Sequence, residues 1–200
     1  MRFTALFAVA SATISAVSAS TLDFSSISLQ SLLGGIDVSS GNKYGAPKAP
    51  WIAGSTPGWY FGSSPSKFKT LPCLSGIICA ILELFPDCLH CPSAPPTTPS
   101  PSDGYAQTFS NLTGATQASD YMTYGLVDTV AQCKAMCNSV NGCNFVNTYH
   151  DVNGKGGSTQ LTCSLFTSCH TSADADNMGG QTQPDGTVDY ITNSDGWCKQ

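Results

Sequence analysis

Ten cysteines in a chain of 200 residues constrain this fold more than any other feature of the sequence. So many cysteines, in even number, favour disulfide pairing, and disulfides persist in oxidising compartments. A proline-rich tract divides them into two even groups, so each group can close bridges within itself. The first group is Cys73, Cys79, Cys88 and Cys91, and the second is Cys133, Cys137, Cys143, Cys163, Cys169 and Cys198.

Residues 1–19 have the features of a signal peptide. A basic start at Arg2 precedes an apolar run, and Val17-Ser18-Ala19 fits the small-residue rule for cleavage before Ser20. The run contains serine and threonine and is shorter than the roughly 20 apolar residues that a transmembrane helix needs. We therefore expect a secreted, extracellular chain that does not insert into a membrane, with cell-wall association as one destination.

Composition divides the remaining chain into three parts. Residues 20–91 are rich in Gly, Pro and Ser, residues 92–101 form a Pro/Ser/Thr linker, and residues 102–200 contain six of the cysteines. Proline lacks a backbone donor, so the linker is expected to be an extended spacer that is open to O-glycosylation or cleavage. The net charge of −5 is concentrated in the last part and excludes a phosphate-binding, nucleic-acid protein as the default.

The first cysteine group surrounds a short predicted helix. Ile77–Phe85 reads as a buried helix that Pro86 ends. The Cys88-x-x-Cys91 spacing, with His90 inside it, allows a redox dithiol or, with Cys73 and Cys79, a zinc knuckle. A proline tract follows in place of the helix that a redox motif needs, so we expect two structural disulfides and no metal. Four cysteines allow three pairings, and the sequence does not choose among them.

The second cysteine group lies on a pattern of one helix and several strands. Thr129 and Gln132 have capping-box form, which predicts a helix over residues 130–138. Alternating apolar residues and flanking turn residues predict four strands, and together these elements predict an α+β fold, one disulfide-stapled helix on an antiparallel sheet. The expected strands are residues 121–124, 143–149, 161–165 and 187–191.

The spacing Cys133-x3-Cys137-x5-Cys143-Asn-Phe145, followed by Leu161-Thr-Cys163, resembles the apple/PAN domain. The sequence around residues 145–155 and 191–198 is similar to secreted fungal (basidiomycete) proteins described as fruit-body specific. The resemblance covers about residues 103–200. It implies an α+β fold with Cys133 paired to Cys163 and Cys137 to Cys143, which leaves Cys169 with Cys198. It also implies binding of carbohydrate or protein.

Catalytic motifs do not accompany the titratable residues. His90, His150 and His170 are expected to be solvated loop histidines, because no nucleophile elbow or zinc-protease motif surrounds them. Glu83 is the only glutamate, and the spacing of the aspartates singles out no pair for glycoside hydrolysis. We therefore expect no enzymatic activity and no cofactor.

Two further patterns have a specific chemical meaning. Asp174–Gly179 with Asp185 faintly resembles a calcium loop, but Met178 occupies a ligand position, so we expect no metal site. Asn111-Leu112-Thr113 is an acceptor sequence for N-glycosylation, placed ahead of the first expected strand.

The favoured hypothesis is a secreted, non-enzymatic recognition module for an extracellular glycan or protein, at the fungal cell wall or fruiting body. Aromatic and Asn/Asp side chains in the loops can stack on and hydrogen-bond a polysaccharide. The candidate ligand-binding residues are Tyr149, His150, Asp151, Asn153, Tyr190 and Trp197. The alternatives are a structural cell-wall or matrix protein, in which residues 20–91 associate, and a small secreted hydrolase.

Overall fold

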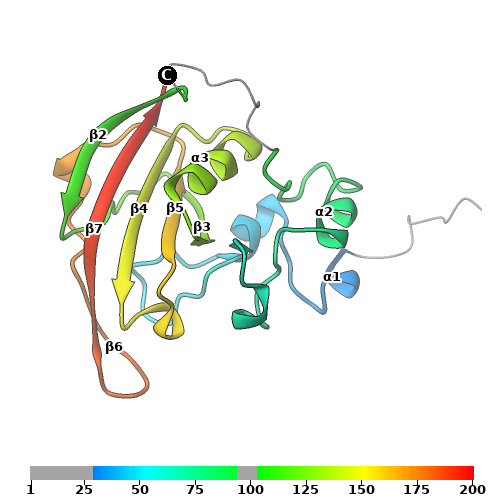
Figure 1. The fold of residues 1–200 in the computed structure, drawn as a ribbon, viewed down its shortest axis with the longest axis horizontal. Helices are drawn as coiled ribbons and strands as arrows, with labels where there is room; N and C mark the ends of the chain where they lie inside the picture. The colour runs from blue at the N-terminus through cyan, green and yellow to red at the C-terminus, as the bar shows by residue number, and fades with distance from the viewer. Residues whose placement is uncertain (1–28, 94–102) are drawn as a thin grey trace, which may run out of the picture.

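The computed structural model describes residues 29–93 and 103–200, so the expected signal peptide and most of the linker lie outside the described residues. Its centre is one seven-stranded sheet with the strand order β1-β3-β5-β4-β7-β2, and β6 pairs with β7 (Figure 1). The strands are β1 (Tyr60–Phe61), β2 (Tyr105–Leu112), β3 (Tyr121–Val127), β4 (Phe145–Val152), β5 (Leu161–Phe166), β6 (Gly179–Thr182) and β7 (Val188–Lys199). The helices are α1 (Leu29–Leu32), α2 (Ile77–Leu82) and α3 (Val130–Ser139), and short 3-10 turns are η2 (Ser40–Gly45), η3 (Pro65–Lys67), η4 (Lys155–Gly157) and η5 (Ser172–Asp174).

The α+β class is confirmed, but the sheet is mixed. The four expected strands are found within β3, β4, β5 and β7, and these strands pair antiparallel. Strand β1 pairs parallel with β3. The expectation of a purely antiparallel sheet is therefore wrong at one edge, because a segment from before the linker joins the sheet there.

Helix α3 is the main helix and lies across one face of the sheet (Figure 1). The capping box forms as expected: the Thr129 hydroxyl accepts from the Gln132 backbone N–H, and the Gln132 side chain accepts from the Thr129 N–H. The buried side of the helix carries both of its cysteines and Met136. Helix formation therefore follows from the local sequence, while the cysteines and Met136 attach the helix to the sheet.

Three disulfides hold the region after the linker together. Cys133–Cys163 joins α3 to β5, Cys137–Cys143 joins the end of α3 to the start of β4, and Cys169–Cys198 joins the loop after β5 to β7. These are the pairings that the resemblance implied. Each closed loop restricts the unfolded chain and contributes about 2–4 kcal/mol.

The N-terminal region packs directly on the sheet. Trp59 and Tyr60 are fully buried, and the Trp59 indole lies over Gly125 of β3, where a Cβ atom would overlap the ring. Backbone hydrogen bonds run from Gly58 to Tyr124 and from Leu126 to Trp59. Residues on both sides of the linker therefore share one core.

Two expectations about the segment around α2, residues 73–91, are wrong. Cys79 pairs with Cys91, but Cys73 and Cys88 are free thiols, so one disulfide replaces the two expected. Backbone bridges hold Cys73 against Tyr60 and Cys88 against Ser39, so each thiol is anchored to a different segment. The helix ends at Leu82, and only that residue of α2 is buried, so α2 is a surface helix in place of the buried one expected.

Strand β2 was not expected from the sequence. Tyr105 and Phe109 are buried, while the three residues between them are exposed. Register shifts against β7 on both sides of Phe109 interrupt the period-two pattern. The glycosylation sequence at Asn111 therefore lies at the end of the first long strand of the sheet, and not ahead of all strands.

Candidate functional site

The expected ligand-binding residues do not form one surface. Tyr149 and Asp151 are buried on the sheet face opposite α3, where Tyr149 packs with Ile191 and its hydroxyl lies 3.5 Å from Ser164 Oγ. His150 alternates with them along β4 and so points to the opposite face. Tyr149 and Asp151 therefore lie on one face of the sheet and His150 on the other, because neighbouring residues of a strand face opposite sides.

Two other expected ligand-binding residues, Asn153 and Tyr190, are accessible. Asn153 has φ 64°, is exposed, and donates from Nδ2 to the Val188 carbonyl at 3.0 Å. Tyr190 is 50% exposed. Asn153 therefore stabilises a turn, and of the two only Tyr190 presents an open aromatic surface.

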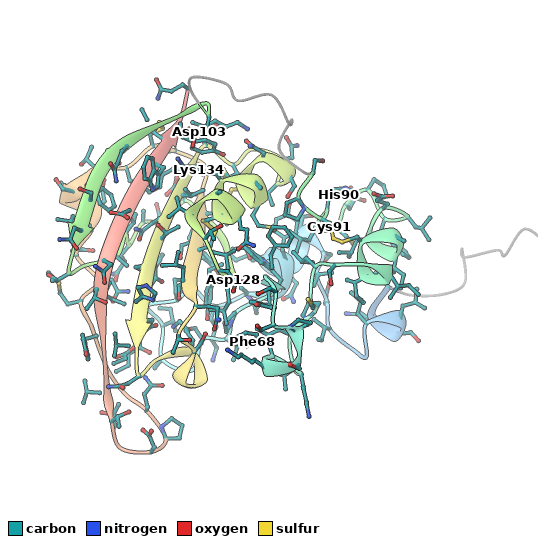
Figure 2. The ribbon with its side chains drawn as sticks, viewed as in Figure 1. Phe68, His90, Cys91, Asp103, Asp128 and Lys134 are labelled. Carbon is teal, nitrogen blue, oxygen red and sulfur yellow. A yellow bond between two sulfur atoms is a disulfide. The ribbon has the colours of Figure 1, made fainter. Side chains whose placement is uncertain are left out.

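The Lys134 ammonium covers one face of the Trp197 ring. The Lys134 ammonium lies 3.5 Å from the Trp197 ring centroid and 2.7 Å from Asp103 Oδ2 (Figure 2). The hydrogen bond from Lys134 holds the pKa of the Asp103 carboxyl below its ordinary value. Lys134, on the buried side of α3, is thus neutralised by Asp103 and packed on Trp197.

A buried ion pair lies at the end of β4. Lys155 Nζ is 2.9 Å from Asp151 Oδ2, and the two side chains are 5% and 3% exposed. The same ammonium donates to the Pro50 carbonyl at 3.1 Å and to Ser55 Oγ at 3.4 Å. Lys155 therefore ties the loop after β4 to the N-terminal region.

A second carboxyl group, that of Asp189, lies beside the ion pair. Asp189, which is also buried, lies near Asp151 and accepts from the Gln181 backbone N–H. Burial raises the pKa of Asp151 above its ordinary value; the Lys155 ammonium opposes this rise and Asp189 adds to it.

A pocket of about 540 Å³ with both polar and apolar lining lies beside this network. That volume is within the range of small-molecule sites. The network connects the walls of the pocket, because Lys155 contacts Ser55 and Asp189 contacts Gln181. The lining residues are Ala53, Gly54, Ser55, Thr56, Lys155, Gly156, Gln181, Thr182, Gln183 and Pro184.

His170 forms a second, half-buried polar cluster with two aspartates. Its Nε2 is 3.0 Å from Asp120 and its Nδ1 is 3.3 Å from Asp174, and the ring packs edge-on against Phe145 and Phe166. The side chain is 12% exposed. The expectation of a solvated loop histidine is therefore wrong here, because two carboxylates and two aromatic rings hold the imidazole in place.

The cysteines and aspartates of the redox-like and calcium-like sequences have structural roles. Cys91 bonds Cys79, so the Cys88-x-x-Cys91 sequence is not a dithiol, and His90 lies beside that bridge (Figure 2). Asp174 caps η5 and Asp185 stabilises the turn at Thr187. Within residues 29–93 and 103–200, no cluster of three or more His, Cys, Asp or Glu can hold a metal ion, and no helix is long and apolar enough to cross a membrane.

Sequence reasoning found Asp151 but missed its partners. The spacing of Asp151 and Lys155, four residues apart in the sequence, is the only local signal of the ion pair. Ser55, Gln181 and Asp189 come from distant segments that meet only in the folded chain. The pocket is therefore a product of tertiary structure.

No family model, curated protein or solved structure matches this chain.

Proposed function

We propose that this chain is a secreted, non-enzymatic recognition module that binds an extracellular carbohydrate or protein at the fungal cell wall or fruiting body. The observation that carries the proposal is the pocket bounded by the N-terminal region, the Lys155 loop and β6, whose lining includes hydroxyl and amide side chains. Four disulfides support export to an oxidising compartment. The pairings Cys133–Cys163 and Cys137–Cys143 support the apple/PAN assignment.

The chemistry of the pocket favours a neutral saccharide over a charged ligand. Lys155 is the only charged residue of the lining, and its ammonium is already bonded to Asp151, Pro50 and Ser55. The remaining polar groups are hydroxyls and amides, which match the donors and acceptors of sugar hydroxyl groups. These groups belong to Ser55, Thr56, Gln181, Thr182 and Gln183.

The two alternatives receive less support from the same contacts. Glycosidases expose two carboxyl groups to the substrate, roughly 5–9.5 Å apart, whereas Asp151 and Asp189 are both buried and Asp151 is paired with the Lys155 ammonium. A matrix protein that associates through its N-terminal aromatic residues would need them at the surface, but Trp59 and Tyr60 are fully buried. A non-enzymatic binding role therefore agrees best with these positions.

The test uses the full chain, secreted from a eukaryotic host, on a glycan array and on insoluble fungal cell-wall material. Thr182→Trp places a large ring in the pocket from an exposed lining position. Ala131→Trp is the matched control on an exposed position of α3, away from the lining. We expect the wild type to bind, and soluble sugar to compete with this binding. Thr182→Trp should weaken the binding at least about tenfold, which is about 1.4 kcal/mol, whereas Ala131→Trp should leave it unchanged.

Three results would contradict the proposal. Sugar-competed binding that both tryptophan variants retain would exclude this pocket as the site. Retention on wall material that no sugar competes would favour the matrix protein. Turnover of a polysaccharide, lost in an Asp151→Asn variant that still folds, would favour the hydrolase.

A further inference from the structure

The acceptor sequence Asn111-Leu112-Thr113 lies at the exposed edge of the sheet. Strand β2 is the last strand in the order of the sheet and pairs only with β7 among the described strands. In Figure 1 it lies on the side away from α1 and α2, with the orange segment that contains η5 beside it. Asn111 and Thr113 are both exposed. The sequence therefore places an exposed modification site at the end of an edge strand.

This edge lacks two of the usual protections against pairing with another chain, charged residues and proline, although bulges interrupt it and η5 contacts it. Edge strands are commonly protected by charged residues, proline or short length. Strand β2 has eight residues, and none of them is charged or proline. The opposite edge, β1, has only two residues. Register shifts on both sides of Phe109 disturb the β2 ladder, but Ala106, Gln107, Thr108 and Ser110 remain exposed.

The geometry at Asn111 leaves its side-chain nitrogen available. The backbone has φ 53°, and its N–H donates to Asp195 Oδ1 at 2.9 Å. The Asn111 Oδ1 atom accepts from Asn193 Nδ2 at 3.1 Å. The Nδ2 atom of Asn111 has no hydrogen-bond partner among residues 29–93 and 103–200. A substituent on Nδ2 therefore breaks no contact of the fold, while two hydrogen bonds hold its attachment point.

We propose that Asn111 carries an N-linked oligosaccharide that prevents the uncharged β2 edge from pairing with a second chain. In the transfer, Asn111 Nδ2 bonds to the anomeric carbon of a lipid-pyrophosphate-linked oligosaccharide. The bond from that carbon to the pyrophosphate breaks, Nδ2 loses one proton, and the lipid pyrophosphate leaves. The proposal requires export of the chain, which it shares with the proposed function, and does not require ligand binding in the pocket.

The experiment compares four secreted chains: the wild type, Thr113→Ser, Thr113→Ala and the double variant Thr113→Ala/Thr108→Lys. Thr113→Ser keeps the acceptor hydroxyl, whereas Thr113→Ala removes it and loses only a contact of 3.9 Å to Met178 Sδ. Mass spectrometry before and after N-glycosidase treatment reads the state of Asn111. Light scattering after size exclusion reads the oligomeric state, and circular dichroism confirms that each variant is folded.

We expect the wild type and Thr113→Ser to be glycosylated monomers. Thr113→Ala should lack the glycan and self-associate as its concentration rises. The Thr108→Lys change should restore the monomer, because a charge on the edge replaces the glycan.

Each contrary outcome has a distinct meaning. An unmodified Asn111 in a secreted wild-type chain would overturn this proposal while leaving the proposed function intact. A chain retained in the cytosol would overturn both. Glycosylated wild type together with a Thr113→Ala variant that stays monomeric at every concentration would overturn the role of the glycan at the edge. Loss of sugar binding by Thr182→Trp has no bearing on any of these readouts.

Discussion

Replacing Lys155 by methionine should destabilise the protein strongly at neutral pH. The substitution keeps an unbranched side chain of similar reach but removes the ammonium that pairs with Asp151 at 2.9 Å and bonds the Pro50 carbonyl. Both side chains of the ion pair are almost fully buried, at 5% and 3% exposed, so little solvent screening applies. Removing one partner of a buried pair costs about 3–5 kcal/mol, because the other charge stays buried without compensation.

The loss should shrink in acid. The pKa of Asp151 is raised above its ordinary value by burial. Because the pKa of Asp151 is higher in the folded state than in the unfolded state, protonation of Asp151 stabilises the fold. This stabilisation is complete below the ordinary pKa and is lost as the pH rises through the pKa of Asp151 in the folded state. Removing the ammonium, which opposes the rise, raises this pKa further. The difference between wild type and Lys155→Met is therefore largest near pH 7 and smaller near about pH 4, where Asp151 binds a proton.

The assay is urea unfolding followed by tryptophan fluorescence, with disulfides intact, at both pH values. Lys69→Met, which removes an exposed lysine, is the control and should change stability by less than about 0.5 kcal/mol. Asp151→Asn added to Lys155→Met should recover part of the loss at neutral pH. The reasoning is refuted by a Lys155→Met loss below about 1 kcal/mol, or by one of equal size at both pH values.

Three further predictions test other contacts. Asp120→Asn should remove about 1–2 kcal/mol of stability at neutral pH and flatten the acid limb of a stability–pH profile. Burial raises the pKa of Asp120, but hydrogen bonds from a loop amide and an imidazole outweigh burial and hold this pKa below its ordinary value. The stabilisation by Asp120 is therefore present above its ordinary pKa and is lost as the pH falls through the lowered pKa; an unchanged profile from urea unfolding contradicts this. Gly125→Ala should cost about 1–3 kcal/mol and shift the fluorescence of the indole that covers it, and an unchanged emission spectrum contradicts the packing. Alkylation of the unfolded, unreduced protein followed by peptide mapping should label Cys73 and Cys88 and no other cysteine, and a bridge between these two would contradict the free thiols.

Local sequence predicted the helix and the strands that alternate regularly. The Thr129 capping box and the spacing of Cys133 and Cys137 specify α3 almost completely, because the signal is a set of contacts within one turn. Strand β2 could not be predicted in the same way, since its register shifts against β7 interrupt the alternation. Period-two patterns therefore identified β4 and β5 and missed β2.

Contacts between distant segments account for the errors in the candidate site. Asp151 looked like a loop residue beside a glycine-rich turn, but β4 continues to Val152, and both Tyr149 and Asp151 are buried. The Lys155 ammonium reaches Pro50, which lies on the other side of the linker. Composition alone treated those two regions as separate, so it could not indicate a pocket that both of them line.

The four disulfides each join cysteines on the same side of the linker, so residues 29–93 and 103–200 have no disulfide between them. The edge pairing of β1 with β3 and the burial of Trp59 are noncovalent. A protease that cut the folded chain between residues 93 and 103 would therefore produce two fragments that stay together in native buffer. Denaturant without any reductant would separate them.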